Sequence, residues 1–269
     1  MPPTPARGPS GRDALRASFD DDAAAYDRAR PVAPASVVDD LVALAGLRPG
    51  SPVVEVGPGT GQATRPLAER GLRIVAVELG ARLAARARRN LAPFAGVDVV
   101  TSSFEAWDPG ADRFDAVVAC NSFHWLHPGL RFPRSAAVLR PGGHLVVLAT
   151  PWVVPEGAER FWWDVQDDSA AAGAERVDPA TKHPDRVDDI GPAVRASGLF
   201  EEPMLRRRPF AVTFSADGYA TALSTQSAVK ELPPADRAEL VDRVRRRIVA
   251  GGGTLTAHLL AVLTVARRR

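Results

Sequence analysis

Short apolar segments alternate with amphipathic segments over the first half of the chain. Apolar runs bounded by Gly, Pro or charged residues predict buried strands, and apolar positions at three- and four-residue steps predict helices. Helical patterning around residues 19–26 and 37–44 precedes the first strand. On this basis we expect strands at 52–56, 73–77, 97–100, 114–119 and 144–149, with helices at 62–70, 81–91 and 130–139.

The second half of the chain has a different pattern. Residues 202–214 alternate weakly and predict a strand, and 235–250 predict a charged helix that ends at three glycines. For residues 254–266 we favour a strand over a helix, because threonine and β-branched residues are enriched there. We divide the chain into a disordered lead-in (1–17), a core with N-terminal helices (18–150), a helical insertion or lid (151–200), and C-terminal strands and helices that complete the sheet and cap (201–269).

Strands that alternate with helices over about 100 residues indicate right-handed βαβ units. We therefore predict an α/β, Rossmann-like, doubly wound and mostly parallel seven-stranded sheet with a helical cap or insertion. In such sheets ligands bind beyond the carboxyl ends of the strands. The residues that directly follow each strand are therefore the candidates for function.

Composition narrows the classes of partner. The 269 residues are 45% hydrophobic, enough for a sizeable core, and 34 basic against 32 acidic residues give a net charge of only +2. So small an excess does not predict a nucleic-acid partner. A single cysteine, Cys120, excludes an internal disulfide, and no apolar stretch reaches the roughly 20 residues of a membrane span. We expect a cytoplasmic monomer or homodimer with no membrane partner.

A glycine-rich loop, Gly57-Pro58-Gly59-Thr60-Gly61, separates the first predicted strand from its helix. Glycines permit a tight turn and close approach of a ligand, and the helix start offers N–H groups to an anion. The anion can be the pyrophosphate of a dinucleotide or the carboxylate of S-adenosyl-L-methionine. Glu78 ends the second predicted strand, 21 residues after Gly57, where a carboxylate can accept both hydroxyls of a ribose.

The spacing of the glycines distinguishes between a dinucleotide and S-adenosyl-L-methionine as the ligand. A dinucleotide fingerprint, G-x-G-x-x-G, requires a third glycine at position 62 or 64, where Gln62 and Thr64 stand. An NAD-dependent oxidoreductase is therefore the weaker alternative. A non-catalytic regulator that binds the cofactor is a second alternative.

Four segments carry a family resemblance. VVEVGPGTGQATRPLAERG (53–71) and IVAVELG (74–80) resemble the first two motifs of the class I S-adenosylmethionine-dependent methyltransferases. FDAVVACNSFHWLHP (114–128) and LRPGGHLVV (139–147) resemble their fourth- and fifth-strand motifs. LSTQSAVKELP (223–233) is similar to the C-terminal part of a bacterial small-molecule subgroup. The resemblance implies methyl transfer to an O, N or C nucleophile of a small molecule, driven mainly by proximity and orientation.

The resemblance also implies how the cofactor is bound. A purely structural role remains open for three residues. Glu55 can be a partner of loop amides, Ser103 a turn residue and Tyr26 a core side chain. The implied roles are Gly57, Gly59 and Gly61 along the methionine end with Glu55 beneath it, Glu78 at the ribose, Ser103 and Phe104 beside the adenine, Asn121 and Ser122 on the methyl-donor side, and Tyr26 and Arg30 closing over the cofactor.

His124 is the candidate catalytic base, because it follows the fourth strand at the functional edge of the sheet. The alternative is that His124 only packs beside Trp125. Cys120, His124 and His127 do not match a familiar zinc spacing, so we predict no metal. The aromatic residues Trp152, Phe161, Trp162 and Trp163 either wall an apolar pocket or form the core of the lid.

Overall fold

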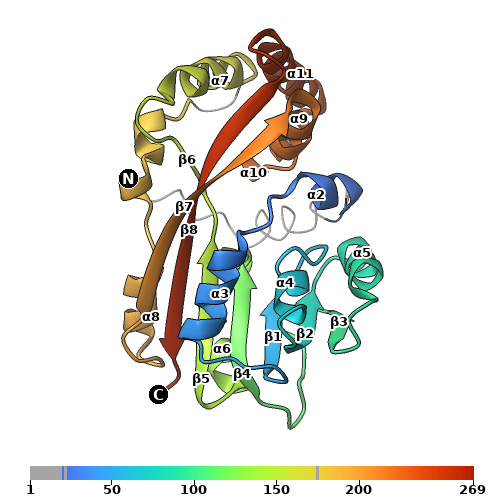
Figure 1. Cartoon of the computed structure of the whole chain (residues 1–269), viewed down its shortest axis with the longest axis vertical. Helices are drawn as coiled ribbons and strands as arrows, with labels where there is room; N and C mark the ends of the chain where they lie inside the picture. Colours follow the sequence, from blue (N-terminus) through green and yellow to red (C-terminus); the bar gives the residue numbers. More distant parts are fainter. Residues whose placement is uncertain (1–19, 21–22, 174–175) are drawn as a thin grey trace.

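The computed structural model describes residue 20 and residues 23–173 and 176–269. The predicted lead-in at 1–17 lies outside this range, as does Phe19. Eight strands form one sheet, and the helices lie against its two faces and in a cap beyond its end (Figure 1). No helix within the described ranges is long and apolar enough to cross a membrane.

The strands run in the order β3-β2-β1-β4-β5-β8-β6, with β7 paired to β8. The first five are parallel, and β8 is antiparallel to β5, β6 and β7. The mostly parallel Rossmann-like sheet is therefore confirmed, with the two-residue strand β6 as an addition. The bounds are β1 (Pro52–Val56), β2 (Arg73–Glu78), β3 (Val97–Thr101), β4 (Phe114–Cys120), β5 (Leu139–Ala149), β6 (Trp152–Val153), β7 (Met204–Ser215) and β8 (Thr254–Arg267).

The helices alternate with the strands as the pattern predicts. Three short 3₁₀ turns, η1 (Phe123–Trp125), η2 (Pro179–Lys182) and η3 (Pro184–Arg186), lie in the connections. The helices are α2 (Ala23–Ala29), α3 (Ala35–Leu44), α4 (Thr64–Ala68), α5 (Ala81–Leu91), α6 (Arg131–Val138), α7 (Glu159–Ala171), α8 (Gly191–Ser197), α9 (Ala216–Ser224), α10 (Ser227–Lys230) and α11 (Pro234–Ala250).

Each face of the sheet has its own apolar core, because successive side chains of a strand point to opposite faces. Val53 belongs to the core beneath α3, α4 and α5, and its neighbour Val54 belongs to the core beneath α6 and α8. Both valines are completely buried. Strands buried on both sides explain why the sequence shows continuous apolar runs rather than alternation.

The bounds of helix α4 and strand β5 differ from the predicted ones. Helix α4 is two residues shorter at each end than 62–70, because turns occupy its flanks. Strand β5 begins at Leu139 rather than at residue 144. Leu139 already pairs with Phe114, and a register shift then absorbs the Pro-Gly-Gly segment before Ala116 pairs with His144. Pairing with β4 thus overrides a local sequence that is typical of a turn.

Strand β8 connects the sheet to the cap. Its residues 262–267 pair with β5, and its residues 254–265 pair with β7, from Thr254–Ser215 to Val265–Met204. Fourteen residues of strand span about 46 Å. The distal part of this ribbon therefore extends beyond the sheet, where α7, α9 and α11 gather around it (Figure 1).

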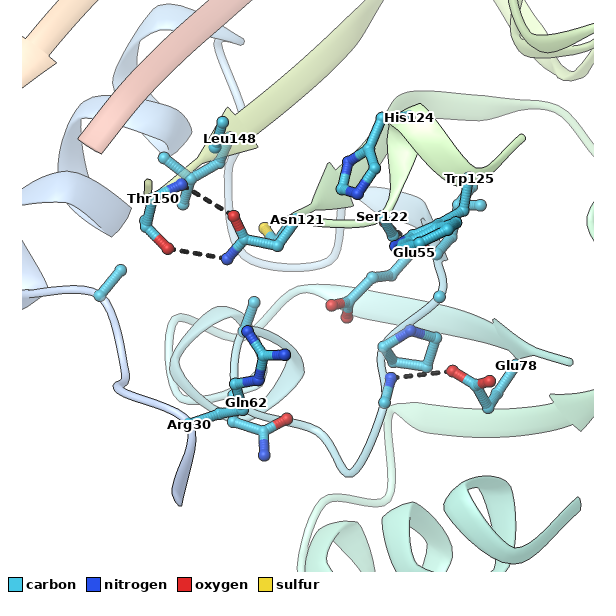
Figure 2. Close-up of a pocket in the computed structure, with 18 of the residues that line it drawn as sticks. Arg30, Glu55, Gln62, Glu78, Asn121, Ser122, His124, Trp125, Leu148 and Thr150 are labelled. Carbon is cyan, nitrogen blue, oxygen red and sulfur yellow. Dashed lines mark hydrogen bonds between the residues drawn. The ribbon is translucent and has the colours of Figure 1, made fainter. Parts of the chain in front are cut away.

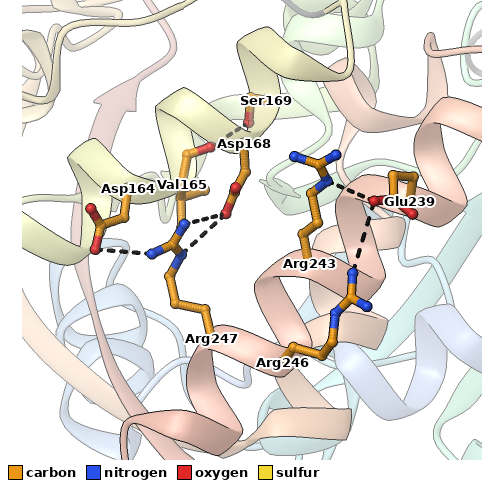
Figure 3. Close-up of polar contacts among 8 residues, drawn as sticks. All are labelled: Asp164, Val165, Asp168, Ser169, Glu239, Arg243, Arg246 and Arg247. Atoms are coloured by element: carbon orange, nitrogen blue, oxygen red, sulfur yellow. Dashed lines mark hydrogen bonds and ion pairs between the residues drawn. The ribbon is translucent and has the colours of Figure 1, made fainter.

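The cap has a separate core and a polar joint. Tyr219, Leu240 and Val244 are fully buried within it. Arg247 on α11 donates to Asp168 on α7 at 3.0 and 3.1 Å, and lies 3.3 Å from Asp164 (Figure 3). The side chain of Asp168 is only 12% exposed, and Arg247 is the cation that pairs with it.

Replacing Arg247 with Met should lower the free energy of unfolding by about 1–2 kcal/mol, because it leaves a mostly buried carboxylate without its cation. The matched control is Arg246→Met, at the residue that precedes Arg247. The side chain of Arg246 is 62% exposed and pairs with Asp242 on the surface. That change should cost less than about 0.5 kcal/mol. Urea unfolding of the two variants measures the difference, and equal stabilities would show that the joint contributes nothing.

Candidate functional site

One cavity of about 520 Å³ opens at the carboxyl ends of β1, β2, β4 and β5. Its wall is completed by the connection between α2 and α3, by α3, the segment around β6, the η3–α8 loop and α10. The cavity therefore lies between the sheet and the cap, at the edge where the sequence places its candidate residues. Its volume is in the range of small-molecule sites.

The glycine loop brings backbone directly to the cavity. Gly57, Gly59 and Gly61 have φ values of +63°, +62° and +101°, which glycine adopts at no steric cost. A Cβ on Gly57 would lie 2.8 Å from Cβ of Ser122, so glycine is required there for space as well. Gly57 and Gly59 line the cavity, whereas Gly61 does not; its α face is filled by the side chain of Leu91.

Glu78 ties the loop to the end of β2. Its two carboxylate oxygens each accept one backbone N–H at 2.9 Å, from Gly59 (Figure 2) and from Gly80. Burial raises the pKa of this carboxyl, while these N–H groups act in the opposite direction. Since an ionised carboxylate has about four acceptor positions, Glu78 retains acceptors for a ligand in the cavity that it lines.

Glu55 lies deeper, beneath the loop (Figure 2). It is 1% exposed, and burial together with the charge of Glu78 raises its pKa to about 7. Its Oε2 atom has no hydrogen-bond partner among the described residues. No hydrogen bond joins Glu55 to an amide of the glycine loop among the described residues, so the alternative of a partner for loop amides is not seen, and a buried polar atom remains at the floor of the cavity.

Helix α2 is attached to the glycine loop by Asp27, which the sequence analysis missed because no motif marks it. Asp27 accepts hydrogen bonds from the Thr60 hydroxyl at 2.6 Å and from the amide of Asn90 at 2.9 Å, and pairs with Arg86 at 2.8 Å. These bonds lower the pKa of Asp27 against the effect of burial. At the end of α2, Arg30 lines the cavity and donates to the carbonyl of Thr225 at 3.0 Å. Tyr26 belongs to α2, but its side chain lies outside the described part of the structure.

Asn121 and Ser122 line the cavity where β4 ends. Asn121 has φ +55° and makes two hydrogen bonds with Thr150 at the end of β5, at 2.8 and 2.7 Å (Figure 2). The hydroxyl of Ser122 donates to the carbonyl of Val56. These contacts join the ends of β1, β4 and β5, so both residues hold the edge of the sheet together.

His124 also lines the cavity, in the 3₁₀ turn η1 after β4 (Figure 2). Its ring centroid lies 4.9 Å from that of Trp125, so it packs beside this residue as well. Loss of water contact, with the positive charges of Arg131 and Arg30, lowers the pKa of His124 to about 4. The imidazole is therefore neutral at pH 7, and the same lowering of its pKa makes it a weaker base than a free imidazole.

The residues after β3 divide into two groups. Ser102 and Phe104 line the cavity, and Phe104 is 2% exposed. Ser103 is not among the lining residues, and its hydroxyl accepts the N–H of Ala106 at 3.1 Å. This contact is what the turn alternative for Ser103 predicts.

The aromatic residues after β5 also divide. Trp152 lines the cavity, whereas Phe161 and Trp162 pack into the core of the cap and Trp163 is 37% exposed. Among the described residues no group of three His, Cys, Asp or Glu side chains is placed to bind a metal. His127 lies outside the cavity, where its Nδ1 accepts the N–H of Gly129 at 3.2 Å.

Comparison with known proteins gives one family match. A family model described as a methyltransferase domain matches residues 53–143, from β1 into β5. An uncharacterized methyltransferase of Mycobacterium tuberculosis is 35% identical over 136 residues, which are 51% of this chain and 53% of that protein. The chain thus spans about half the length of this relative.

Two further comparisons, one with a protein and one with a solved structure, show how much of the chain each of them matches. Ribosomal RNA small subunit methyltransferase A of Methylibium petroleiphilum is 51% identical, but over only 55 residues, 20% of this chain and 22% of that protein. A solved structure from Anaeromyxobacter dehalogenans, assigned as a type II methyltransferase, superposes with a TM-score of 0.59 and 21% identity over 89% of this chain and 97% of that one. This likeness shows a common fold.

The buried carboxyl of Glu55 should make stability depend on pH. Because its pKa is about 7 in the folded state and 4.5 in the reference state, the folded protein binds the extra proton between these values. The Glu55 contribution to the free energy of unfolding should therefore fall by up to about 3 kcal/mol as pH rises from 4.5 to 8. Unfolding of wild type and Glu55→Gln across this range measures it; a stability difference that is constant with pH would contradict it.

Proposed function

We propose that this chain, whose residues 53–143 form a methyltransferase domain of the class I fold, transfers the methyl group of S-adenosyl-L-methionine to an oxygen, nitrogen or carbon nucleophile of a small molecule. The observation that carries the proposal is the convergence of the positive-φ glycine loop and Glu78 on one cavity that the cap closes. This arrangement supplies N–H groups, a carboxylate and an enclosed space next to each other.

The residues present fit this cofactor. The backbone at Gly57, where a Cβ would clash, leaves room for the methionine end to approach, with Glu55 beneath it. Glu78 would accept the ribose hydroxyls, and Phe104 would lie against the adenine. Arg30 and Tyr26 would close the site from α2. When bound, the cofactor supplies an electrophilic methyl group on a sulfonium.

Positioning of the acceptor would supply most of the rate. Fixed orientation of two reactants can lower a barrier by roughly 7–11 kcal/mol. The Asn121–Thr150 pair and the Ser122–Val56 bond support this role, because they fix the edge on which both ligands would lie. A hydroxyl acceptor also has to lose a proton, and neutral His124 is the candidate to accept it.

A small molecule is the acceptor class that the cavity favours. The cap side of the cavity is lined by β6, the η3–α8 loop and α10, and the cavity has a volume of about 520 Å³. A nearly balanced net charge of +2 also argues against a polyanionic substrate.

Calorimetric titration with S-adenosyl-L-homocysteine, S-adenosyl-L-methionine and NAD tests the cofactor. We expect micromolar affinity for the two sulfur compounds, lowered about 10- to 100-fold in Glu78→Gln, because the ribose loses a charged acceptor. The control is Glu69→Gln, an exposed glutamate after α4, which should bind as wild type does. Binding of NAD, or of none of the three, would overturn the proposal.

Replacing His124 with Asn should lower turnover of a hydroxyl acceptor at least 100-fold, because the candidate general base is removed. Affinity for S-adenosyl-L-homocysteine should stay within about threefold of wild type, and a carboxylate acceptor should be unaffected because it carries no proton. His127→Asn is the matched control, three residues away and outside the cavity. Unchanged turnover in His124→Asn would remove His124 from the mechanism.

A further inference from the structure

The wall of the cavity that faces away from Glu78 is built by residues beyond the matched domain. After residue 150 the lining comes from Pro151, Trp152, Val187, Asp188, Ser227 and Leu259. Most of this wall is apolar, and Asp188 carries the one charged group among these six residues. If the proposed cofactor occupies the glycine loop and Glu78, this wall is where the acceptor has to lie.

Trp152 forms a fixed aromatic surface on this wall. It belongs to β6, which pairs with Leu259 and His258 of β8. Its ring contacts the rings of Phe214, Tyr219 and Trp162, with centroids 5.7, 5.7 and 6.5 Å apart. Rings packed in this way lose little freedom when a ligand stacks against them.

The backbone on both sides of Asp188 is held in place by hydrogen bonds and packing. The backbone before it is anchored by Arg207, which donates to the carbonyls of Val187 at 2.9 Å and Pro184 at 2.7 Å. The side chain of Val187 packs against the cluster of Val153, Leu260 and Val262, next to Trp152. After it, Asp189 accepts the N–H of Gly191 at the start of α8, at 2.7 Å.

The carboxylate of Asp188 itself makes no hydrogen bond or ion pair with any of the described residues. Asp188 is an exposed residue, so its carboxylate stands where the apolar lining meets solvent, and with no internal partner it is suited to a cation supplied by a ligand. Arg30, the arginine that lines the same cavity, is bonded to Thr225 instead.

We propose that Trp152 and Asp188 form the acceptor subsite, and that the acceptor is a small aromatic molecule with a positively charged nitrogen. The proposal rests on the proposed function, because the remainder of the cavity is assigned to the cofactor. The ring would stack on Trp152 between Leu259 and Val187, and the charged nitrogen would lie at Asp188. Selectivity would thus come from the cap side of the cavity, outside residues 53–143.

Three indoles of nearly equal shape test the proposal: tryptamine, tryptophol and indole-3-propionate, which end in an ammonium, a hydroxyl and a carboxylate. S-adenosyl-L-homocysteine is titrated first, and each indole is then titrated into the saturated complex. We expect tryptamine to bind at least tenfold tighter than indole-3-propionate, with tryptophol between them. If S-adenosyl-L-homocysteine does not bind, the proposed function has failed. If it binds but the three indoles do not follow this order of affinity, only the proposed subsite is overturned.

Variants assign the effect to the two residues. Asp188→Asn should reduce the preference for tryptamine to less than threefold, whereas Asp185→Asn, an exposed carboxylate outside the cavity, should keep it. Trp152→Phe should weaken all three indoles about tenfold. Trp162→Phe, which removes an indole from the same aromatic cluster but not from the cavity, should change them less than threefold. A preference that survives Asp188→Asn, or no indole binding to the saturated complex, would refute the proposal.

Discussion

The pairing of β8 is the interaction on which the rest of the structure depends. On one side it pairs with β5 and continues the sheet, and on the other its residues 254–265 pair with β7. Because the ribbon extends past the sheet, the cap core and the sheet cores share one strand: Leu263 and Val265 lie in the sheet, and Ala257 lies in the cap. The cavity is the space that this arrangement leaves between the two layers.

Two carboxyl groups at the floor of that cavity are almost inaccessible to solvent. Glu55 and Glu78 are 1% and 7% exposed, and the charge of one raises the pKa of the other. Glu78 compensates with backbone N–H groups, whereas Glu55 keeps an oxygen without a partner. Buried polar groups with unmet hydrogen bonds are uncommon and concentrate at functional sites. The two buried carboxyl groups and the glycine loop therefore indicate the same functional site.

The parallel strands and the loop were predictable from sequence because their signals are local. Apolar runs, glycine spacing and an acid at the end of a strand each occupy fewer than 25 residues. The cavity wall was not predictable in this way: Trp152 and Asp188 reach the same cavity through the packing of their neighbours Val153 and Val187, which no periodicity encodes. Asp27 was missed for the same reason, since Thr60 and Asn90 lie more than 30 residues away. The start of β5 was wrong because pairing with Phe114 overrode a Pro-Gly-Gly segment.

The β5–β8 pairing also constrains how the chain reaches its native state. Partners such as Val147 and Thr264 are more than 100 residues apart, and closing so long a loop is a slow step in folding. Until β8 arrives, β5 presents an unpaired edge that contains Val146, Val147 and Leu148, all nearly inaccessible to solvent in the finished sheet. Such an edge is a template for intermolecular strand pairing. The strand that unites sheet and cap therefore also sets the interval during which the nascent protein is most exposed to aggregation.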